Sequence, residues 1–209
     1  MREYPKIQSI FKRDEKTHKF INGQYSSLEF EYLKDNLWQF TEKIDGTNIR
    51  VGWEANDSGE FELRYGGRTS NAQIPTFLLS RLQELFDDFD WFLSFPDGVV
   101  LYGEGYGAKV QKGGGNYIPD GVDFILFDVL IDGWWLKRAD VEMVAQSLGI
   151  KVVPFLGEGT INDAVTSVKG GLLSTFGEFQ AEGMVLKPRV ELKSRAGHRI
   201  ITKLKGKDF

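Results

Sequence analysis

A lysine beside a glycine turn is the first group in this sequence that could act as a nucleophile. Lys43 is followed by Asp45 and Gly46 in the string TEKIDGTNIRV. A lysine amine must be neutral to attack, and its free pKa is about 10.4. Nearby cations and a dry pocket lower that pKa and so activate the amine. The motif alone is weak, because K-x-D-G arises by chance in roughly one chain of this length in twenty.

Four further segments carry charged or aromatic residues where a strand would display them. In chain order these are Glu104 in LYGEGYG, Phe127 and Asp128 in FILFDVLIDG, Glu182 and Lys187 in AEGMVLKP, and Lys203 and Lys205 in ITKLKGK. Lys203 and Lys205 alternate with Leu204, so a strand there places both ammonium groups on one face. Such cations could lower the pKa of Lys43 and neutralise phosphate charge, unless they only form an exposed strand face.

Together these segments resemble the signature motifs of the covalent nucleotidyltransferase superfamily, which comprises ATP-dependent DNA ligases, RNA ligases and mRNA capping enzymes. The motifs follow the family's order over residues 38–207. Asn48 stands where DNA ligases and capping enzymes usually have Arg. KIDGTN and EGMVLKP are similar to RNA ligases of the RNA-editing and second phage type, although that branch often has His at the position of Asp45. The resemblance implies an ATP-dependent RNA ligase that joins 3′-hydroxyl and 5′-phosphate ends.

The resemblance also implies a role for each motif residue. Lys43 would form a covalent lysyl–AMP from ATP, with Lys203 and Lys205 as catalytic cations. The residues implied to bind the nucleotide are Glu42 (base pocket), Asn48 (phosphate), Arg68 (ribose or phosphate), Glu104 (ribose), Phe127 (adenine stacking), Lys187, Lys203 and Lys205. Glu182 and Asp128 would hold Mg²⁺, a hard cation that prefers oxygen ligands. Each has a plainer alternative, such as core packing for Phe127 and turn formation for Asn48.

Positive charge is concentrated near the C-terminal end of the sequence. The whole chain carries a net charge of −4, but eight cations against two acids give residues 187–209 a net charge of +6. Such asymmetry indicates either a surface that faces a polyanion or a solvated basic tail. The resemblance implies RNA ends as the partner, and a further protein is expected as a second source of end recognition.

The strands that display these residues follow from apolar–polar alternation. Segments 38–44 and 49–54, joined by the turn DGTN, are predicted to form a β-hairpin, and a third strand is predicted at 61–65. A helix beginning at Thr76 is predicted to place five apolar residues on one face: Leu78, Leu82, Leu85, Phe86 and Phe89. The motif residues should therefore lie on strands and beside turns.

The remaining segments alternate strands with two helices. Strands are predicted at 99–103, 124–131, 134–137, 152–155, 183–187 and 199–205. Helices are predicted over 139–148 and from Thr160, where Asp163 completes a capping box. The pattern predicts an α+β fold of two packed, mainly antiparallel sheets with flanking helices. The resemblance implies the ATP-grasp-like nucleotidyltransferase domain of polynucleotide ligases.

Length and composition limit the alternatives. The 209 residues fit one domain, and only four residues follow Lys205, so we expect no C-terminal OB-fold or helical domain. The absence of cysteine excludes a thiolate nucleophile. No signal peptide or membrane span is visible, and we expect a cytoplasmic protein of a microbe or phage-infected cell. An ATP-dependent DNA ligase, a GTP-dependent capping guanylyltransferase and an inactive nucleotide- or RNA-binding regulator remain alternatives.

Overall fold

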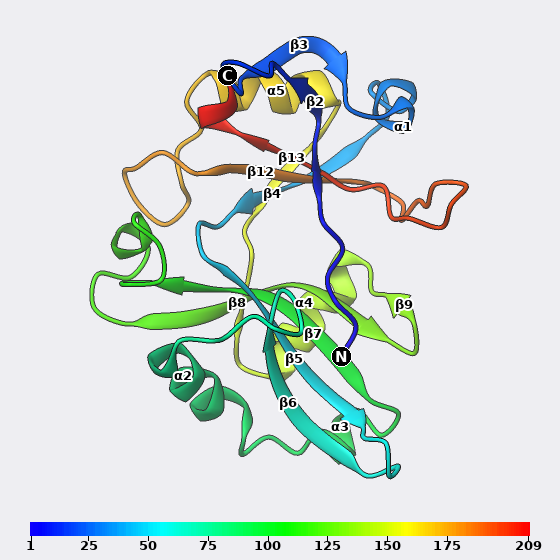
Figure 1. The fold of residues 1–209 in the computed structure, drawn as a ribbon, viewed down its shortest axis with the longest axis vertical. Coiled ribbons are helices and arrows are strands. Elements are labelled where there is room, and N and C mark those ends of the chain that lie inside the picture. Colours follow the sequence, from blue (N-terminus) through cyan, green and yellow to red (C-terminus); the bar gives the residue numbers. More distant parts are fainter. The chain divides into compact units, whose positions relative to one another are not determined.

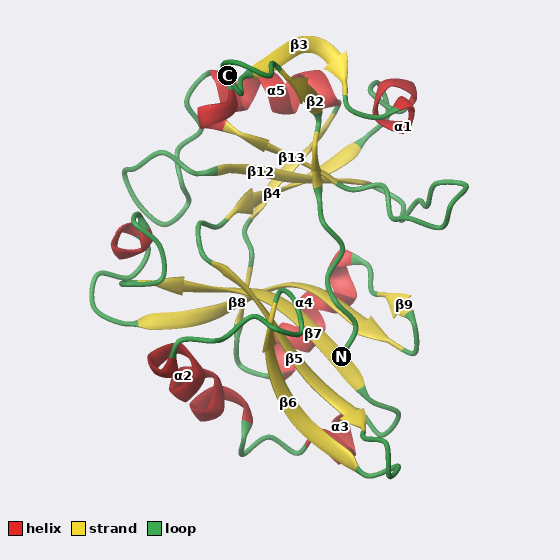
Figure 2. Cartoon of the chain, viewed as in Figure 1, coloured by secondary structure: helices red, strands yellow, loops and turns green.

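The structure, a computed structural model, describes residues 1–209 and divides into two compact units. Unit 1 comprises Met1–Pro5 and Asp45–Val153, and unit 2 comprises Lys6–Ile44 and Pro154–Phe209. Each unit has its own sheet and hydrophobic core, and strands outnumber helices throughout (Figures 1 and 2). No helix is both long and apolar enough to cross a membrane. The α+β class with mostly antiparallel strands is confirmed, whereas the expectation of a single domain stays a prediction.

Unit 2 is built on a five-stranded sheet with the order β1-β13-β12-β4-β11. The strands are β1 (Gln8–Ser9), β13 (Thr202–Lys205), β12 (Gly183–Pro188), β4 (Trp38–Lys43) and β11 (Phe155–Gly159). All neighbours are antiparallel except β1 and β13. The other elements are the ribbon β2 (Phe11–Arg13) and β3 (Phe20–Tyr25), helices α1 (Leu28–Tyr32) and α5 (Ile161–Lys169), and the 3₁₀ turn η2 (Gly206–Asp208). The predicted capping box of Thr160 and Asp163 starts α5.

Alternation along the strands gives the unit 2 sheet two different faces. Trp38, Phe40, Met184, Leu186 and Leu204 are buried in one core with the apolar side of α5. The residues between them on the same strands therefore point to the opposite face. That second face, which we call the lysine face, carries Lys43, Lys187, Lys203 and Lys205, all partly buried. The predicted placement of Lys203 and Lys205 on one face is confirmed.

Unit 1 contains a six-stranded sheet whose main path is β10-β8-β7-β5-β6, with β9 paired to β8. The strands are β5 (Thr47–Ala55), β6 (Phe61–Gly67), β7 (Val99–Gly107), β8 (Val122–Ile131), β9 (Trp134–Trp135) and β10 (Lys151–Val152). The helices are α2 (Thr76–Phe86), α3 (Trp91–Ser94) and α4 (Arg138–Ser147), with the 3₁₀ turn η1 (Gly114–Asn116). One face of the sheet packs on α2 and α4, and three of the predicted α2 residues, Leu78, Leu82 and Phe86, are buried there.

The predicted hairpin of residues 38–54 is wrong. β4 pairs with β12 and β11, and β5 pairs with β6 and β7, so the two strands belong to different sheets. The turn DGTN is the place where the chain passes from unit 2 to unit 1. A type I′ hairpin turn requires positive φ at both central residues, and neither Asp45 nor Gly46 has one.

The predicted strand at 152–155 is also wrong, for a related reason. Val152 ends β10 in the sheet of unit 1, and Phe155 begins β11 in the sheet of unit 2. The Val153–Pro154 bond joins the two units, and proline lacks the N–H that would continue a strand pairing. Two short strands with different partners thus look like one strand in the sequence.

Candidate active site

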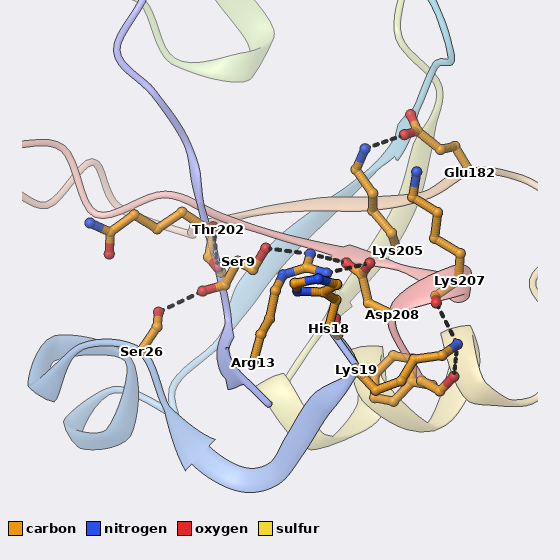
Figure 3. A network of polar contacts seen from close by, with 12 residues as sticks. Ser9, Arg13, His18, Lys19, Ser26, Glu182, Thr202, Lys205, Lys207 and Asp208 are labelled. Atoms are coloured by element: carbon orange, nitrogen blue, oxygen red, sulfur yellow. Dashed lines mark hydrogen bonds and ion pairs between the residues drawn. The ribbon is translucent and has the colours of Figure 1, made fainter. Parts of the chain in front are cut away.

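Glu182 lies between two lysines from distant parts of the chain. One carboxylate oxygen is 2.6 Å from the Lys43 ammonium, and the other is 2.5 Å from the Lys205 ammonium (Figure 3 shows the second pair). Strand register explains the convergence, because Gly183 is paired with Lys43 on one side and with Lys205 on the other. The structure therefore brings together the predicted nucleophile, one predicted catalytic cation and one predicted metal ligand.

The electrostatics of Glu182 are dominated by these two cations. Burial raises the pKa of the Glu182 carboxyl, but its ion pairs and hydrogen bonds with Lys43 and Lys205 outweigh burial and hold the pKa below its usual value. All three side chains are less than one fifth exposed. The carboxylate is thus ionised at neutral pH and neutralises part of the charge on the lysine face.

Gly183 allows β12 to approach β13 closely at this point. Its φ is +155°, and a β-carbon added to it would lie 1.9 Å from the Leu204 carbonyl oxygen. Only glycine fits such an approach without a backbone shift. The glycine of the E-G-x-V-x-K motif is therefore required by packing, because its missing side chain lets Glu182 lie close to the K-x-K strand.

Three of the four predicted nucleotide-binding residues of unit 1, Asn48, Glu104 and Phe127, lie on one face of its sheet. Ile49 and Leu101 point into the core under the helices, so Asn48 and Glu104 point to the other face. These two residues are direct cross-strand partners. The Asn48 side-chain oxygen is buried without a hydrogen-bond partner. Since an unpaired buried oxygen is costly, Asn48 has capacity to accept a hydrogen bond from a ligand.

A β-bulge in β8 places Phe127 and Asp128 side by side on this same face. Tyr102 pairs with Asp128 while Gly103 pairs with Leu126, which leaves Phe127 as the extra residue. Leu126 and Val129 both remain in the helix-covered core. Simple alternation would have separated Phe127 from Asp128, and the bulge brings them together. Phe127 is partly buried, with its ring edge-on to Tyr4 at 5.0 Å.

Gly46 of the K-x-D-G motif packs against the strand that carries Glu104. A β-carbon on Gly46 would lie 2.3 Å from the Gly105 carbonyl oxygen and 2.7 Å from the Glu104 side chain. The motif glycine is needed for this close approach rather than for a hairpin turn. Arg68 is exposed directly after β6. Its predicted role in nucleotide binding stays a prediction.

The side chain of Glu42 points away from the face that carries Lys43, and its predicted role in the base pocket stays a prediction. This side chain is 1% exposed and points to the core face, opposite to Lys43. Its carboxylate accepts hydrogen bonds from the Ser174 hydroxyl at 2.5 Å and from the Thr175 amide and hydroxyl at 2.9 and 2.7 Å. Glu42 therefore anchors the loop that leads to Glu182.

Asp128 is fully buried, and its carboxylate accepts a hydrogen bond of 2.5 Å from the Tyr4 hydroxyl. This contact secures the N-terminal segment of unit 1. The chain contains no group of three or more His, Cys, Asp or Glu residues arranged to hold a metal ion. Any Mg²⁺ would have to complete its coordination with substrate oxygens and water, which is how Mg²⁺ is commonly bound at phosphate sites.

Several residues that support the motifs carry no recognisable sequence signal. The Tyr117 hydroxyl accepts a hydrogen bond from the Asp45 amide, and the Gln111 side chain donates one to the Gly46 carbonyl. Both residues flank η1 and hold the backbone of the K-x-D-G motif. Tyr117 and Gln111 lie in a glycine-rich stretch without periodicity, so only their contacts reveal this role.

An ion pair joins the β2–β3 ribbon to the end of the K-x-K strand (Figure 3). The Arg13 guanidinium donates to both carboxylate oxygens of Asp208, at 2.8 and 2.5 Å. Asp208 is 2% exposed and lies in η2, immediately after β13. The Lys19 ammonium also donates to the backbone carbonyl of Lys207 at 2.7 Å. We call the Arg13–Asp208 pair the latch, because it fixes the strand that carries Lys203 and Lys205.

Comparison with protein families identifies this set of motifs. The family model for RNA ligase matches residues 36–205, which is most of the chain. The chain therefore belongs to the RNA ligase family. No curated protein sequence matches it.

Solved structures with the same fold include RNA ligases from different sources. An RNA ligase of Naegleria gruberi with PPi is 19% identical, with a TM-score of 0.64, and the match covers 85% of this chain and 51% of that one. A mutant of that ligase with ATP and Mn is 18% identical, with a TM-score of 0.65, and the match covers 87% and 54%. An archaeal ATP-dependent RNA ligase is 20% identical, with a TM-score of 0.63, and the match covers 98% and 48%. The chain thus spans about half the length of these ligases.

Proposed function

We propose that this chain performs the nucleotidyl-transfer chemistry of an ATP-dependent RNA ligase, with Lys43 as the nucleophile. The Lys43 amine attacks the α-phosphorus of ATP, a P–N bond forms, and pyrophosphate leaves with the broken P–O bond. AMP then passes to the 5′-phosphate of an RNA end, and a 3′-hydroxyl displaces AMP as the phosphodiester forms. Family membership supports the reaction class, and the contact of Glu182 with Lys43 and Lys205 carries the assignment of residues.

We propose that Lys43 is in its resting state when it is paired with Glu182. This pair joins the Lys43 ammonium to the Glu182 carboxylate, whereas attack requires a neutral amine. The pair must therefore open and the lysine must lose its proton before the P–N bond can form. Lys205, at the other oxygen of Glu182, is the cation that we propose neutralises phosphate charge as it develops.

The face of unit 1 supplies groups that suit a nucleoside and its phosphates. We propose that Glu104 accepts hydrogen bonds from the ribose hydroxyls, that Phe127 stacks on adenine, and that Asn48 orients a phosphate oxygen. The buried, unpaired oxygen of Asn48 also suits a donor on the nucleotide. Lys187 and Lys203, on the lysine face of unit 2, and Arg68 would contact the phosphates as additional cations.

We propose that Glu182 supplies one oxygen ligand to a divalent cation. A carboxylate that now neutralises two ammonium groups could exchange one of them for Mg²⁺, with phosphate oxygens and water as the other ligands. When bound, Mg²⁺ would spread the negative charge of the triphosphate. Asp128 of unit 1, whose carboxylate accepts a hydrogen bond from the Tyr4 hydroxyl, stays a separately proposed Mg²⁺ ligand. The mutant Naegleria ligase with ATP and Mn is consistent with this requirement.

The test is the intact mass of the protein after incubation with ATP and Mg²⁺. We expect a gain of one AMP that pyrophosphate reverses. Lys43→Arg, which keeps the charge but cannot become a neutral nucleophile, should lose this gain by a factor on the order of 10³ or more. The matched control is Lys34→Arg, an exposed lysine. An AMP adduct on Lys43→Arg would contradict the proposal.

The choice of nucleotide and nucleic acid needs a second measurement. Family membership favours RNA ligation over DNA ligation and capping, and we propose ATP and RNA 3′-hydroxyl ends as the substrates. Labelling with α-labelled ATP or GTP distinguishes ligation from capping. Sealing of junctions with RNA or DNA on either side distinguishes the two kinds of ligase. A protein partner for end recognition stays a prediction.

A further inference from the structure

The structure places seven of the eight cations of the basic C-terminal segment in two groups, and the eighth, Lys207, lies in η2. Lys187, Lys203 and Lys205 lie on the strands of unit 2. Arg189, Lys193, Arg195 and Arg199 lie on residues 189–200, a segment between β12 and β13 that we call the arm. The arm leaves the sheet as the orange-red extension in Figure 1. The nucleotide chemistry proposed above uses the strand cations but gives no role to the arm.

The arm is held in a defined hairpin-like shape. Arg199 pairs with Glu191 through two contacts of 2.5 and 2.9 Å, and its side chain is only 4% exposed. The Ser194 amide donates to the His198 carbonyl at 2.7 Å, which closes the tip. At the base, the Arg189 amide donates to the Leu37 carbonyl and the Ile200 amide donates to the Leu192 carbonyl. The arm is thus an ordered platform.

The exposed charge on this platform is positive. The single acid of the arm, Glu191, is neutralised by Arg199. The other three cations, Arg189, Lys193 and Arg195, are exposed. Arg189 is 62% exposed, and its only acidic neighbour within ion-pair range, Glu158, is 3.8 Å away. Three exposed cations on a short ordered segment match the charge of a phosphate backbone, whereas the chain as a whole is acidic.

The arm lies at the opposite end of β12 from Lys43. Gly183, the partner of Lys43 and Lys205, begins β12, and Pro188 ends it next to the arm. Five steps of a strand cover roughly 17 Å. A stacked nucleic-acid strand advances about 3.4 Å per phosphate along its axis, so this distance corresponds to about five stacked nucleotides. Lys203 and Lys187 lie along the same face between the two ends.

We infer that the arm binds the phosphate backbone of the RNA substrate about five nucleotides or more from the end that reacts at Lys43. This inference rests on the proposed ligase function and identifies a substrate-binding surface for it. Phosphate contacts fix the position of a strand without reading its sequence. The arm would therefore contribute affinity and register, and the residues around Glu182 would contribute chemistry.

The first test is binding of a fluorescent, 5′-phosphorylated single-stranded RNA by the arm variant Arg189→Gln/Lys193→Gln/Arg195→Gln. The control is Lys34→Gln/Lys137→Gln/Lys151→Gln, which removes the same charge from exposed positions elsewhere. Loss of three phosphate contacts should lower the slope of log affinity against log salt by about 2. Between about 50 and 200 mM salt, the wild-type affinity should then fall roughly 20-fold more than that of the arm variant. The control should behave as the wild type does.

The second test uses acceptor length. The measured quantity is the RNA concentration that gives half-maximal AMP transfer from adenylylated protein to 5′-phosphorylated RNA. For an RNA long enough to reach the arm, this concentration should be about tenfold higher for the arm variant than for the wild type. For an RNA shorter than about five nucleotides, it should be the same for both proteins. Equal effects on both lengths, an unchanged salt slope, equal losses in the control, or no RNA binding by the wild type would overturn the inference. A wild type that takes up no AMP would instead refute the proposed function.

Discussion

The sheets of the two units each bury one face under helices, yet their other faces differ in character. The lysine face of unit 2 carries four lysines, with Glu182 between two of them. The corresponding face of unit 1 carries Asn48, Glu104 and an aromatic group in which Tyr4 contacts Tyr102, Phe127 and Trp135. The first face is suited to phosphate charge and nucleophilic attack, and the second to hydrogen bonding and stacking with a nucleoside.

The two faces also arise in different ways. The lysine face follows from plain alternation in β12, β13 and β4, so strand period and register suffice to build it. The face of unit 1 depends on a bulge at Phe127 and on Tyr4, which comes from the distant N-terminal segment. Long cationic side chains can be placed by a regular strand, whereas an aromatic ring beside a buried carboxylate requires an irregularity and a supporting contact.

Among changes on the lysine face, removal of Lys205 should reduce the rate of adenylylation most, apart from removal of the proposed nucleophile Lys43. Lys205→Ala removes the cation that we propose faces phosphate, and it leaves Glu182 with one partner. We expect the rate of adenylylation to fall by about 10²- to 10³-fold, with a much smaller change in the concentration of ATP needed for half-maximal rate. Single-turnover AMP transfer from labelled ATP measures both quantities. A normal rate would place Lys205 outside the chemistry.

Loss of the latch should reduce stability. Asp208→Asn leaves Arg13 without its bidentate carboxylate partner in a pair whose acid is almost fully buried. We expect the free energy of unfolding to fall by about 2 kcal/mol, and the melting temperature to fall by roughly 4–8 °C for a chain of this size. The control Asp140→Asn breaks an exposed, 4.0 Å contact with Lys137 and should change stability by less than about 0.5 kcal/mol. Equal melting temperatures would mean that the ribbon does not secure β13.

Asn48→Ala tests the proposed nucleotide-binding face of unit 1, because it removes a neutral polar group from that face. If Asn48 binds the nucleotide, the substitution should raise the half-saturating ATP concentration about tenfold, with a smaller effect on the maximal rate. This is the reverse of the pattern expected for Lys205→Ala. A loss of maximal rate at saturating ATP would instead assign Asn48 to the chemical step.

The ion pairs of Glu182 should produce a small pH dependence of stability. The two lysines hold the pKa of the folded-state carboxyl below its ordinary value of 4.5, despite the opposing effect of burial. The carboxylate therefore stabilises the folded state above about pH 4.5, and this contribution is lost as pH falls from there through the lower folded-state pKa. Chemical unfolding measured across that pH range should show that the free energy of unfolding falls less steeply with decreasing pH for Glu182→Gln than for the wild type. Parallel curves would contradict the ion-pair assignment.

The sequence by itself determined the candidate site residues and the local elements that display them. Lys203 and Lys205 share a face because they are two residues apart in a strand, and α5 begins directly after Thr160 because a capping box forms within four residues. The core side of α2 follows from helical period in the same way. These features depend on neighbours in the chain, so composition and spacing are enough to predict them.

Only the tertiary structure decided which strands are partners and which way several key side chains point. A DGTN turn is compatible with a hairpin, but β4 gains its partners from β12 and β11, more than a hundred residues later in the chain. The burial of Glu42 depends on Ser174 and Thr175, the placement of Phe127 on a bulge, and the latch on residues from both ends of the sequence. Such contacts have no local signature, because their energy comes from groups that meet only when distant segments pack together.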